Sequence, residues 1–564
     1  MRRAQWAAFL AVLFVVTLWM VRPLSSDLDG TVVGPPGDNL FFVWLVDWYR
    51  VTLSGGVLPL DVPVLNAPQG WRLAFNEMTP SMALLGLPGF LAGGPALAYN
   101  TTFLLSFVLT GWFGALWVKR LTGRWAPAII AGAVLAFAPY RMSHALGHLN
   151  LMGTQWVVLY LFCLTTWLQQ GGRRWAVGTA LSLVAVAGTS QYYLFMAGLI
   201  SLVFAWSLLR ARPGWSRGAA FWNEAGLAVT VGLPPIALLV WPYMQLAQAG
   251  MLQARTLDQV RMWSASPTDF VLPSPLHWAL GSWVTAHFDR SLWVESTISV
   301  GVVTLVLAVI GARSAWRGPH ATLVRALTLS AAVAAVLALG TDLRWLGRVV
   351  EIPVPSVLQA WVGGPRAPVM LPGYLLFDQV PFYASMRVWM RWGYFVSICL
   401  APLAGFGVVR LMGTRGQARA LAVAFALVVL IGAELAQQPY PVASIAPRPV
   451  DTWLASQPEP GLVVQLPVTE LGKPDHTFYT VFHRKPFAGA FFGAFLTSQY
   501  RRYEPRLASF PSEAATGALT ELGARWVLVD TTLHRDPASL QSEAEALGWR
   551  VATTQGTQIV FERR

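Results

Sequence analysis

The sequence predicts an α-helical membrane protein with about eleven spans, followed by a C-terminal α/β domain. Of the 564 residues, 55% are hydrophobic and only 12% are charged, which is unlike a soluble domain. Mostly apolar stretches of roughly 16 to 22 residues recur up to about residue 438, and each can cross ~30 Å of hydrocarbon as a helix. After Pro439 the composition becomes that of a small globular unit. We therefore expect a membrane domain over residues 1–438 and a separate domain over residues 439–564.

Helices are the expected form of the spans, because lipid offers no water to satisfy backbone polar groups. We place the spans at about residues 5–22, 97–118, 125–140, 149–168, 175–189, 192–209, 224–246, 293–314, 321–340, 391–412 and 417–437. The first is longer than the ~7 to 15 apolar residues of a signal-peptide core, so we expect it to stay uncleaved.

The arginines and lysines of the short loops predict the orientation. Alternate connections, at 119–124, 173–174, 210–217, 313–325 and 410–419, each carry two or three basic residues and no Asp or Glu. Cytoplasmic loops have this bias, so the pattern favours an N-terminus inside and a C-terminus outside. Topology also accounts for much of the net charge of +13, and we expect no nucleic-acid partner.

The two cysteines carry no chemistry that the sequence reveals. Cys163 and Cys399 both fall inside predicted spans, without the spacing of a metal site or a disulfide framework. We expect both to be small core residues.

Acidic residues mark the long first outer loop, residues 23–96. Asp38 stands at the start of a Trp-rich apolar stretch that suits an interfacial helix. It is either the N-cap of that helix or a functional carboxylate near the lipid surface, beside Asp27 and Asp29. Glu77 precedes a short apolar stretch, residues 81–91, that we expect to be re-entrant or interfacial.

The segment "APYRMSHALGHLNLMGTQW" carries Arg141, His144 and His148 between two predicted spans. Their spacings of three and four residues place them on one face if the helix continues. A His-x-x-x-His pair has metal-ligand spacing, but no third ligand is evident. Anion recognition is the stronger functional interpretation, and an interfacial cap that contacts lipid headgroups is the structural alternative.

A second basic pair lies in "PFYASMRVWMRWGYF", just outside the tenth span. Arg387 and Arg391 are four residues apart, and we expect them on one helical face. Outer arginines oppose the positive-inside bias, so they suit a lipid-phosphate site, with headgroup contact as the alternative. Four further polar residues are candidates to approach the same cavity: Asp269, His277, Asp289 and Glu295.

The C-terminal segment predicts short buried strands at "GLVVQLPV", "RWVLVD" and "TQIVFE", with a helix at "PASLQSEAEALGW". These elements predict an open sheet with helices packed on it. We find no GxGxxG, P-loop or GxSxG motif in it. Its expected task is acceptor or glycan binding, or that of a structural lid.

The order of these features resembles the C-type (GT-C) membrane glycosyltransferases, in particular a bacterial branch with a C-terminal domain. The resemblance is carried by "GDNLFFVWLVDW", "ALAYNTTFLLSFVLTG", "FAPYRMSHALGHLNLMGTQWVVL" and "FYASMRVWMRWGYF", followed by "VVQLPV". It covers most of the chain and is loose only in the last ~100 residues.

The resemblance implies transfer of a sugar from a polyprenyl-phosphate carrier to a glycan, lipid or protein acceptor, on the outer face of the bacterial cytoplasmic membrane. By that implication Asp38 is the general base and Glu77 its acidic partner. Arg141, His144, Arg387 and Arg391 would hold the lipid phosphate, with His148 as a weaker member. The first loop lacks the plain Asp-Glu pair of many relatives, so Asp27 and Asp29 compete for the role of base. A divalent cation, Mg²⁺ or Mn²⁺, held by these acids is also compatible with the resemblance.

Two other functions fit a polytopic chain. A transporter or flippase should show internal repeats or paired broken helices, and charges in the middle of its spans. The sequence shows no repeat, and the middle of each span is nearly free of charge. A non-catalytic membrane scaffold would explain the absence of a sharp motif, and it predicts that Asp38→Asn leaves cell-surface glycans unchanged.

Overall fold

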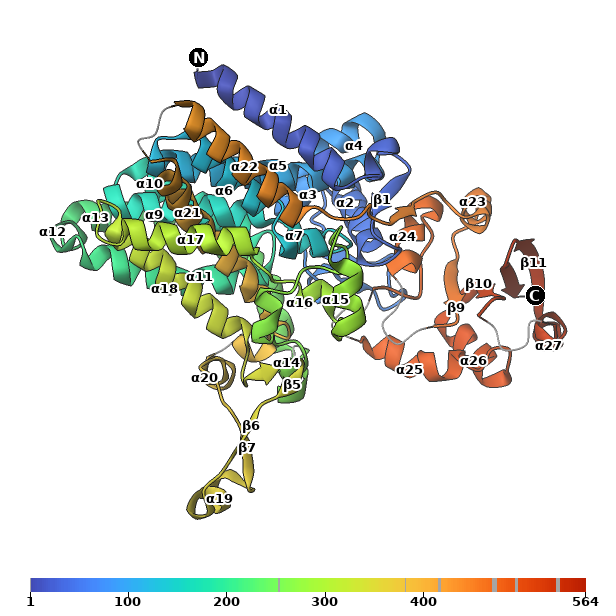
Figure 1. Ribbon diagram of the computed structural model, residues 1–564. Coiled ribbons are helices and arrows are strands. Elements are labelled where there is room, and N and C mark those ends of the chain that lie inside the picture. Colours follow the sequence, from blue (N-terminus) through green and yellow to red (C-terminus); the bar gives the residue numbers. More distant parts are fainter. Residues whose placement is uncertain are drawn as a thin grey trace. The chain divides into compact units, whose positions relative to one another are not determined.

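The computed structural model describes residues 2–251, 254–380, 382–413, 417–468, 474–491, 496–533 and 538–563. The chain forms two compact units (Figure 1). Unit 1 consists of Met1–Ser25, Phe103–Trp241 and Leu252–Tyr440, and unit 2 of Ser26–Thr102, Pro242–Met251 and Pro441–Arg564. The C-terminal residues thus share a unit with the first loop, whereas a domain boundary at 438/439 stays a prediction.

Eight helical segments are long and apolar enough to cross a membrane. They are α1 (Arg2–Met20), α5 (Pro95–Thr122), α6 (Trp125–Ala136) with α7 (Pro139–His144), α8 (Leu149–Met152) with α9 (Thr154–Gln170), α11 (Gln191–Arg210), α13 (Ala219–Gln248), α18 (Ala321–Ala338) and η5 (Trp389–Trp392) with α21 (Gly393–Met412). The protein is therefore a mostly helical, multi-pass membrane protein.

Three further predicted spans correspond to helices outside these eight: α10 (Arg173–Ala187), α17 (Val302–Ala315) and α22 (Gln417–Leu435). The predicted span at 293–314 begins too early. Trp293–Ser296 is a separate short helix, α16, and α17 starts only after the positive-φ Gly301. This break takes Glu295 out of the helix in which the sequence pattern had placed it.

Two of the long segments are interrupted next to the candidate site. Ala138 adopts an extended conformation between α6 and α7, and Pro139 is the first residue of α7. A proline has no N–H to donate and disfavours a helical residue before it, which explains the break. The second interruption is at Gly153, which ends α8 and precedes α9. Glycine destabilises a helix interior because it loses more backbone freedom than other residues.

Helices α17 and α21 pack so closely that only glycine fits at two positions (Figure 1). A Cβ at Gly311 would lie 1.8 Å from the Leu403 carbonyl oxygen, and one at Gly407 would lie 2.0 Å from the Leu307 carbonyl oxygen. Small residues at a crossing allow such close backbone approach between membrane helices.

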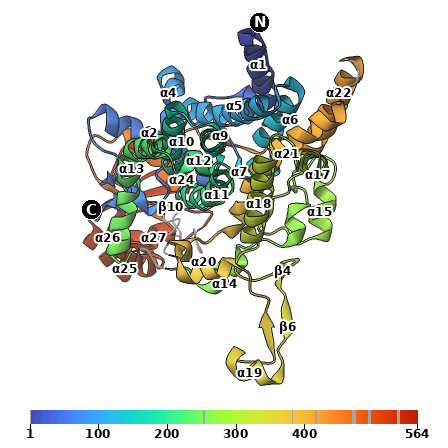
Figure 2. The ribbon, with the colours of Figure 1, turned by 90° about the vertical axis from the view of Figure 1, so that its left-hand side faces the viewer.

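A two-stranded arm extends from unit 1. Strands β6 (Glu351–Pro353) and β7 (Arg366–Pro368) pair antiparallel and carry helix α19 (Ser356–Val362) at the tip. Both views show this arm standing away from the helices of the same unit (Figures 1 and 2). The side chain of Trp361 on α19 is 90% exposed.

Unit 2 contains a four-stranded sheet in the order β11-β12-β10-β9. Strand β9 (Leu462–Leu466) is parallel to β10 (Ala524–Asp530), while β12 (Gln558–Arg563) is antiparallel to both β10 and β11 (Trp549–Gln555). Helices α25 (Ser498–Leu507), α26 (Glu513–Leu522) and α27 (Leu540–Ala546) lie between these strands in the chain. Their apolar residues form one core with the sheet, as a half-buried sheet requires.

The first loop contributes helices to the same unit. They are α2 (Asp38–Ser54), α3 (Pro80–Leu85) and α4 (Leu87–Gly93). Strand β1 (Thr31–Val33) pairs antiparallel with β8 (Val442–Ser444), which follows the last helix of unit 1 in the chain. The apolar stretch 81–91 is thus two short helices rather than one.

Candidate functional site

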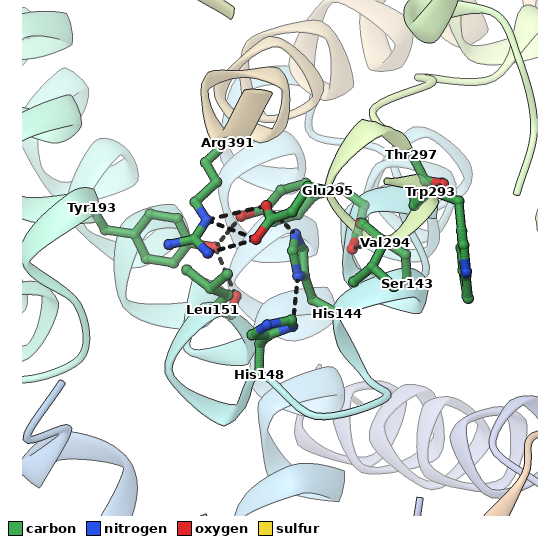
Figure 3. Close-up of polar contacts among 11 residues, drawn as sticks. Ser143, His144, His148, Leu151, Tyr193, Trp293, Val294, Glu295, Thr297 and Arg391 are labelled. Atoms are coloured by element: carbon green, nitrogen blue, oxygen red, sulfur yellow. Dashed lines mark hydrogen bonds and ion pairs between the residues drawn. The ribbon is translucent and has the colours of Figure 1, made fainter. Parts of the chain in front are cut away.

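A buried ion pair between Glu295 and Arg391 is the centre of the candidate site (Figure 3). Arg391 Nη2 donates to Glu295 Oε1 at 2.5 Å, and Arg391 Nε lies 3.1 and 3.2 Å from the two carboxylate oxygens. Only 8% of the Arg391 side chain and 7% of the Glu295 side chain are exposed. The planar guanidinium matches the carboxylate fork, so two short elements, α16 and η5, are joined by a charge-assisted contact.

Two histidines extend the pair. His144 Nε2 lies 3.4 Å from Glu295 Oε2, and His144 Nδ1 lies 3.2 Å from His148 Nδ1. The His148 backbone N–H donates to the His144 carbonyl oxygen at 2.9 Å, so one helical turn continues past the end of α7. His144 therefore lies between the carboxylate and the second imidazole (Figure 3).

The charge of Arg391 keeps Glu295 ionised. Burial by itself raises the pKa of Glu295, but the positive charge and hydrogen bonds of Arg391 lower it further than burial raises it, to about 2. The carboxylate is thus negative at neutral pH. A site with this charge inside a helical unit is expensive to form and is typically functional.

Three tyrosines surround these side chains, and the sequence analysis did not identify them. The hydroxyls of Tyr140 and Tyr193 are 3.2 Å apart, and Tyr193 donates to the Leu151 carbonyl oxygen at 2.7 Å. The ring of Tyr140 contacts His144 with centroids 4.3 Å apart and stacks on Tyr394 at 5.3 Å. Tyr140 precedes His144 by one helical turn, and this spacing was the signal for it in the sequence.

The site offers a metal a set of three ligands. One ligand atom each from His144, His148 and Glu295 lies within 4.8 Å of the others. Glu295 supplies the third ligand that the sequence did not reveal, and two histidines with a glutamate form a known type of zinc site. The guanidinium of Arg391 on both carboxylate oxygens opposes a second cation at the same place. The three ligand atoms therefore suit a metal ion, whereas the positive charge of Arg391 beside them disfavours one.

Arg141 lies in the same helix but points to different partners. Its Nε donates to the Ala136 carbonyl oxygen at 2.9 Å, Nη1 contacts Met152, Thr110 and Thr154, and Nη2 donates to Ser106 at 3.2 Å. The side chain is completely buried. Each guanidinium nitrogen thus bonds a protein oxygen, which favours a role in holding α7 against the middle of α5, the end of α8 and the start of α9. Its phosphate-binding role stays a prediction.

Arg387 and Arg391 do not share a helical face, so that prediction was wrong. Residues 386–388 are not helical, and η5 begins only at Trp389. Both arginines nevertheless contact Tyr192: the Arg387 backbone N–H donates to its hydroxyl at 3.2 Å, and the Arg391 guanidinium lies 4.5 Å from its ring centroid. The half-buried Arg387 guanidinium lies 5.1 Å from the centroid of Trp263.

The predicted acidic residues of the first loop lie in unit 2. Asp38 is the first residue of α2, and the N-cap is Gly37, so the N-cap interpretation of Asp38 was wrong. Glu77 lies in the electrostatic environment of Tyr243, whose hydroxyl donates to the Asn76 carbonyl oxygen at 3.1 Å. Asp27 accepts a bond from the Gly30 backbone N–H at 2.8 Å, and both it and Asp29 are exposed.

Unit 2 also holds an ion pair that the sequence analysis missed. Asp47, on α2, is 2% exposed and pairs with Arg50 at 3.2 Å and with Arg484 at 2.7 Å. Arg484 follows α24 (Pro474–His483), so this pair joins the first loop to the C-terminal part. The only local signal was the spacing of three between Asp47 and Arg50.

The chain has a fold similar to that of the C-type membrane glycosyltransferases. The arabinofuranosyltransferase AftD from Mycobacteria matches with a TM-score of 0.59 and 15% identity, over 100% of this chain and 42% of that chain. The apo oligosaccharyltransferase of Archaeoglobus fulgidus matches with a TM-score of 0.54 and 11% identity, over 94% and 70%. The oligosaccharyltransferase AglB from the same organism, in complex with an inhibitory peptide and a dolichol-phosphate, matches with a TM-score of 0.50 and 11% identity. The match covers 100% of this chain and 74% of that chain.

Residues 8–368 match the family described as "Domain of unknown function (DUF6311)", and the chain belongs to this family. No curated protein matches the sequence. The chain spans about two fifths of the length of AftD.

Proposed function

We propose that the protein is a membrane glycosyltransferase that takes a sugar from a polyprenyl-phosphate donor. One observation carries the proposal: Glu295, Arg391 and His144 come from three separate chain segments and meet in the buried interior of a unit with the GT-C fold. Ionisable groups are costly to bury in a membrane protein and usually mark a substrate path. The structure of AglB with a dolichol-phosphate supports a lipid-phosphate donor for this fold.

The proposed reaction is an inverting displacement. An acceptor hydroxyl attacks the anomeric carbon, the bond from that carbon to the phosphate oxygen breaks, and Asp38 takes the hydroxyl proton, with Glu77 as its acidic partner. The polyprenyl phosphate leaves with the electron pair of the broken bond. Arg387 and Arg391 stabilise its charge, helped by His144 and more weakly by His148.

Arg141 receives a different part in this proposal from the one that its sequence context suggested. Its bonds to Ala136, Met152 and Ser106 hold the turn from which His144 extends. It is a positioning residue that acts through His144. Asp27 and Asp29 remain competing bases, because both lie on the same loop as Asp38.

The proposed location is the bacterial cytoplasmic membrane. The basic loops favour an orientation with the C-terminal residues outside. The acceptor, a glycan, lipid or protein, lies on that outer face.

A divalent cation would bind either the first-loop acids, as Mg²⁺ or Mn²⁺, or the His144, His148 and Glu295 set, as Zn²⁺. Bound there, it would polarise an oxygen of the donor phosphate.

A transfer assay tests the proposal. Membrane vesicles holding the full chain receive radiolabelled hexose- and pentose-linked undecaprenyl phosphates, and transfer to endogenous acceptors is counted. We expect Asp38→Asn to lower transfer by about 10²-fold or more, the usual contribution of a general base. Asp61→Asn is the matched control, because Asp61 is an exposed acid of the same loop. Full activity of Asp38→Asn would overturn the assignment of the base, and no transfer by the unaltered protein would overturn the function.

A further inference from the structure

A separate cavity of about 190 Å³ lies within unit 1. Its walls come from α14 (Leu257–Met262) and η3 (Pro267–Phe270), from the segment between α15 (Gly281–His287) and α16, and from the β4–β5 hairpin (Arg344–Trp345, Arg348–Val349). Its polar lining includes two acids and two arginines: Asp269, Asp289, Arg290 and Arg344. None of these four residues belongs to the site proposed above.

Hydrogen bonds to other residues fix the two arginines in place. Arg290 Nη1 donates to Asp269 Oδ1 at 3.1 Å and Nη2 to the Thr297 hydroxyl at 3.1 Å. Arg344 Nη1 donates to the carbonyl oxygens of Arg261 and Met262, and Nη2 to that of Gly347. The Nε–H groups of Arg290 and Arg344 are buried and have no hydrogen-bond partner among the described residues. A buried donor without a partner costs free energy, so the protein itself does not fully satisfy these two side chains.

The acids balance the arginines. Asp269 accepts a bond from the Ser266 backbone N–H at 2.8 Å besides its pair with Arg290. Asp289, at the exposed rim, accepts one from the Ser291 backbone N–H at 2.9 Å. Two positive and two negative groups leave no net charge to attract an anion or a cation. Donors and acceptors side by side, with Phe288 and Leu346 as apolar lining, suit a neutral polyhydroxyl ligand.

Size and position narrow the ligand further. The cavity is smaller than the roughly 300 to 1,000 Å³ of sites for drug-sized ligands, so it suits one sugar unit rather than a lipid or a peptide. Ser296 and Met390 also line it. They are the chain neighbours of Glu295 and Arg391, so the cavity adjoins the same two short elements, α16 and η5, that carry the buried ion pair.

We infer that this cavity binds a neutral sugar unit of a glycan acceptor. The inference rests on the proposed function and makes it more specific, since it selects a glycan over a peptide or a lipid as the acceptor. The Arg290 and Arg344 side chains donate to ring or hydroxyl oxygens of the sugar, and the Asp289 carboxylate accepts from its hydroxyls. Arg290 and Asp289 are thus specificity residues and take no part in bond breaking.

Binding of methyl glycosides tests the inference without any donor. The full chain in nanodiscs is titrated with methyl hexosides and methyl pentosides, and each Kd is measured by ligand-observed NMR. Arg290→Lys keeps the charge but removes Nε, and Asp289→Asn removes the acceptor charge. We expect each variant to weaken binding of the best glycoside by about tenfold or more. Glu351→Gln, an exposed acid on β6 away from the cavity, is the matched control and should bind as the unaltered protein does.

A second variant keeps the test decisive if Arg290→Lys does not fold. Leu346→Trp fills the cavity from its half-exposed edge and touches neither buried pair, so it should abolish glycoside binding while the thermal midpoint Tm stays unchanged. Absence of glycoside binding, binding of inorganic phosphate in its place, or equal binding by the cavity variants and the control would overturn the inference, even if transfer activity is found. Glycoside binding that the variants abolish, in a protein without transfer activity, would support the sugar site and overturn the proposed glycosyltransferase.

Discussion

At the scale of single residues, the site shows why a carboxylate was missing from the sequence-based hypothesis. The spacing of four predicted that His144 and His148 lie together, and their ring nitrogens are 3.2 Å apart. Glu295, about 150 residues later in the chain, was only one of four candidates because the periodicity merged it with the following span. A break at Gly301 cannot be recognised from hydropathy alone, since glycine is common in membrane helices.

Replacing Glu295 by glutamine tests how much the buried pair contributes. Glu295→Gln leaves the Arg391 charge buried without a counter-charge, and we expect unfolding to become easier by about 3 to 5 kcal/mol. The pKa of Glu295 is about 2 in the folded protein and ordinarily 4.5. The contribution is therefore complete above pH 4.5 and is lost as the pH falls toward 2. The Tm in detergent, compared between the variant and the unaltered protein from pH 7 to pH 3, measures it.

Glu351→Gln is the matched control for Glu295→Gln. Glu351→Gln removes an exposed carboxylate and should leave the Tm unchanged at every pH. A Glu295→Gln protein as stable as the unaltered one at pH 7 would show that the pair contributes little.

Arg141 and Arg387 should respond differently to the same substitution. Lysine cannot reach the several oxygens that Arg141 contacts, so Arg141→Lys should cost about 3 kcal/mol of stability or more. Arg387→Lys should keep the Tm but weaken binding of undecaprenyl phosphate by about tenfold, because it loses the planar fork. Thermal unfolding and lipid-phosphate binding are measured on both. A stable Arg141→Lys protein with weakened lipid binding would restore Arg141 to the phosphate site.

At the scale of helices and strands, the sequence predicted where most of the elements lie better than it predicted where each helix begins, ends or is interrupted. Each of the eleven predicted spans overlaps a helix, because long apolar runs in this composition have few alternatives. The strands at 462–466, 524–530 and 558–563 lie where short apolar runs predicted them. Interruptions were missed, since Ala138 and Gly153 break helices through backbone conformation while their neighbours stay apolar.

The crossing of α17 and α21 gives a prediction at this scale. Gly311→Ala or Gly407→Ala would place a methyl group against the facing backbone, and we expect a loss of about 1 to 3 kcal/mol from the forced separation of the helices. Gly432→Ala is the matched control: it lies in α22, where a Cβ meets nothing within 4 Å. It should gain a few tenths to about 1 kcal/mol from helix propensity. Equal Tm values for all three variants would contradict the tight crossing.

At the scale of the whole molecule, the composition of unit 2 restricts the topology. Residues 26–102 and 242–251 belong to one compact unit, so we expect them on one side of the membrane. Only five of the long apolar segments lie between them among the described residues, and five crossings would end on the opposite side. We therefore predict that helix α10, with 15 residues, crosses as well. This agrees with the predicted span at 175–189, although the full count of eleven stays a prediction.

Cysteine labelling tests this topology with little background, because the native Cys163 and Cys399 are both buried. We expect an impermeant maleimide to label Trp361→Cys, on the exposed tip of α19, in intact cells. Arg173→Cys, at the start of α10, should be labelled only after the membrane is permeabilised, because its loop carries the basic residues typical of the cytoplasmic side. Labelling of both in intact cells would show that α10 or α17 does not cross.

The pairing of β1 with β8 imposes an order on biogenesis. Thr31 pairs with Ser444, so the partner of β1 leaves the ribosome more than 400 residues after it. Until then the first loop has unpaired strand edges and cannot complete its fold, whereas the helices encoded between the two strands can already enter the membrane as they are made. The loop that carries Asp38 thus completes its fold only after residues 442–444 have been synthesised. A ribosome that stalls before residue 442 would leave an inserted helical unit without a finished acidic loop, a natural substrate for membrane quality control.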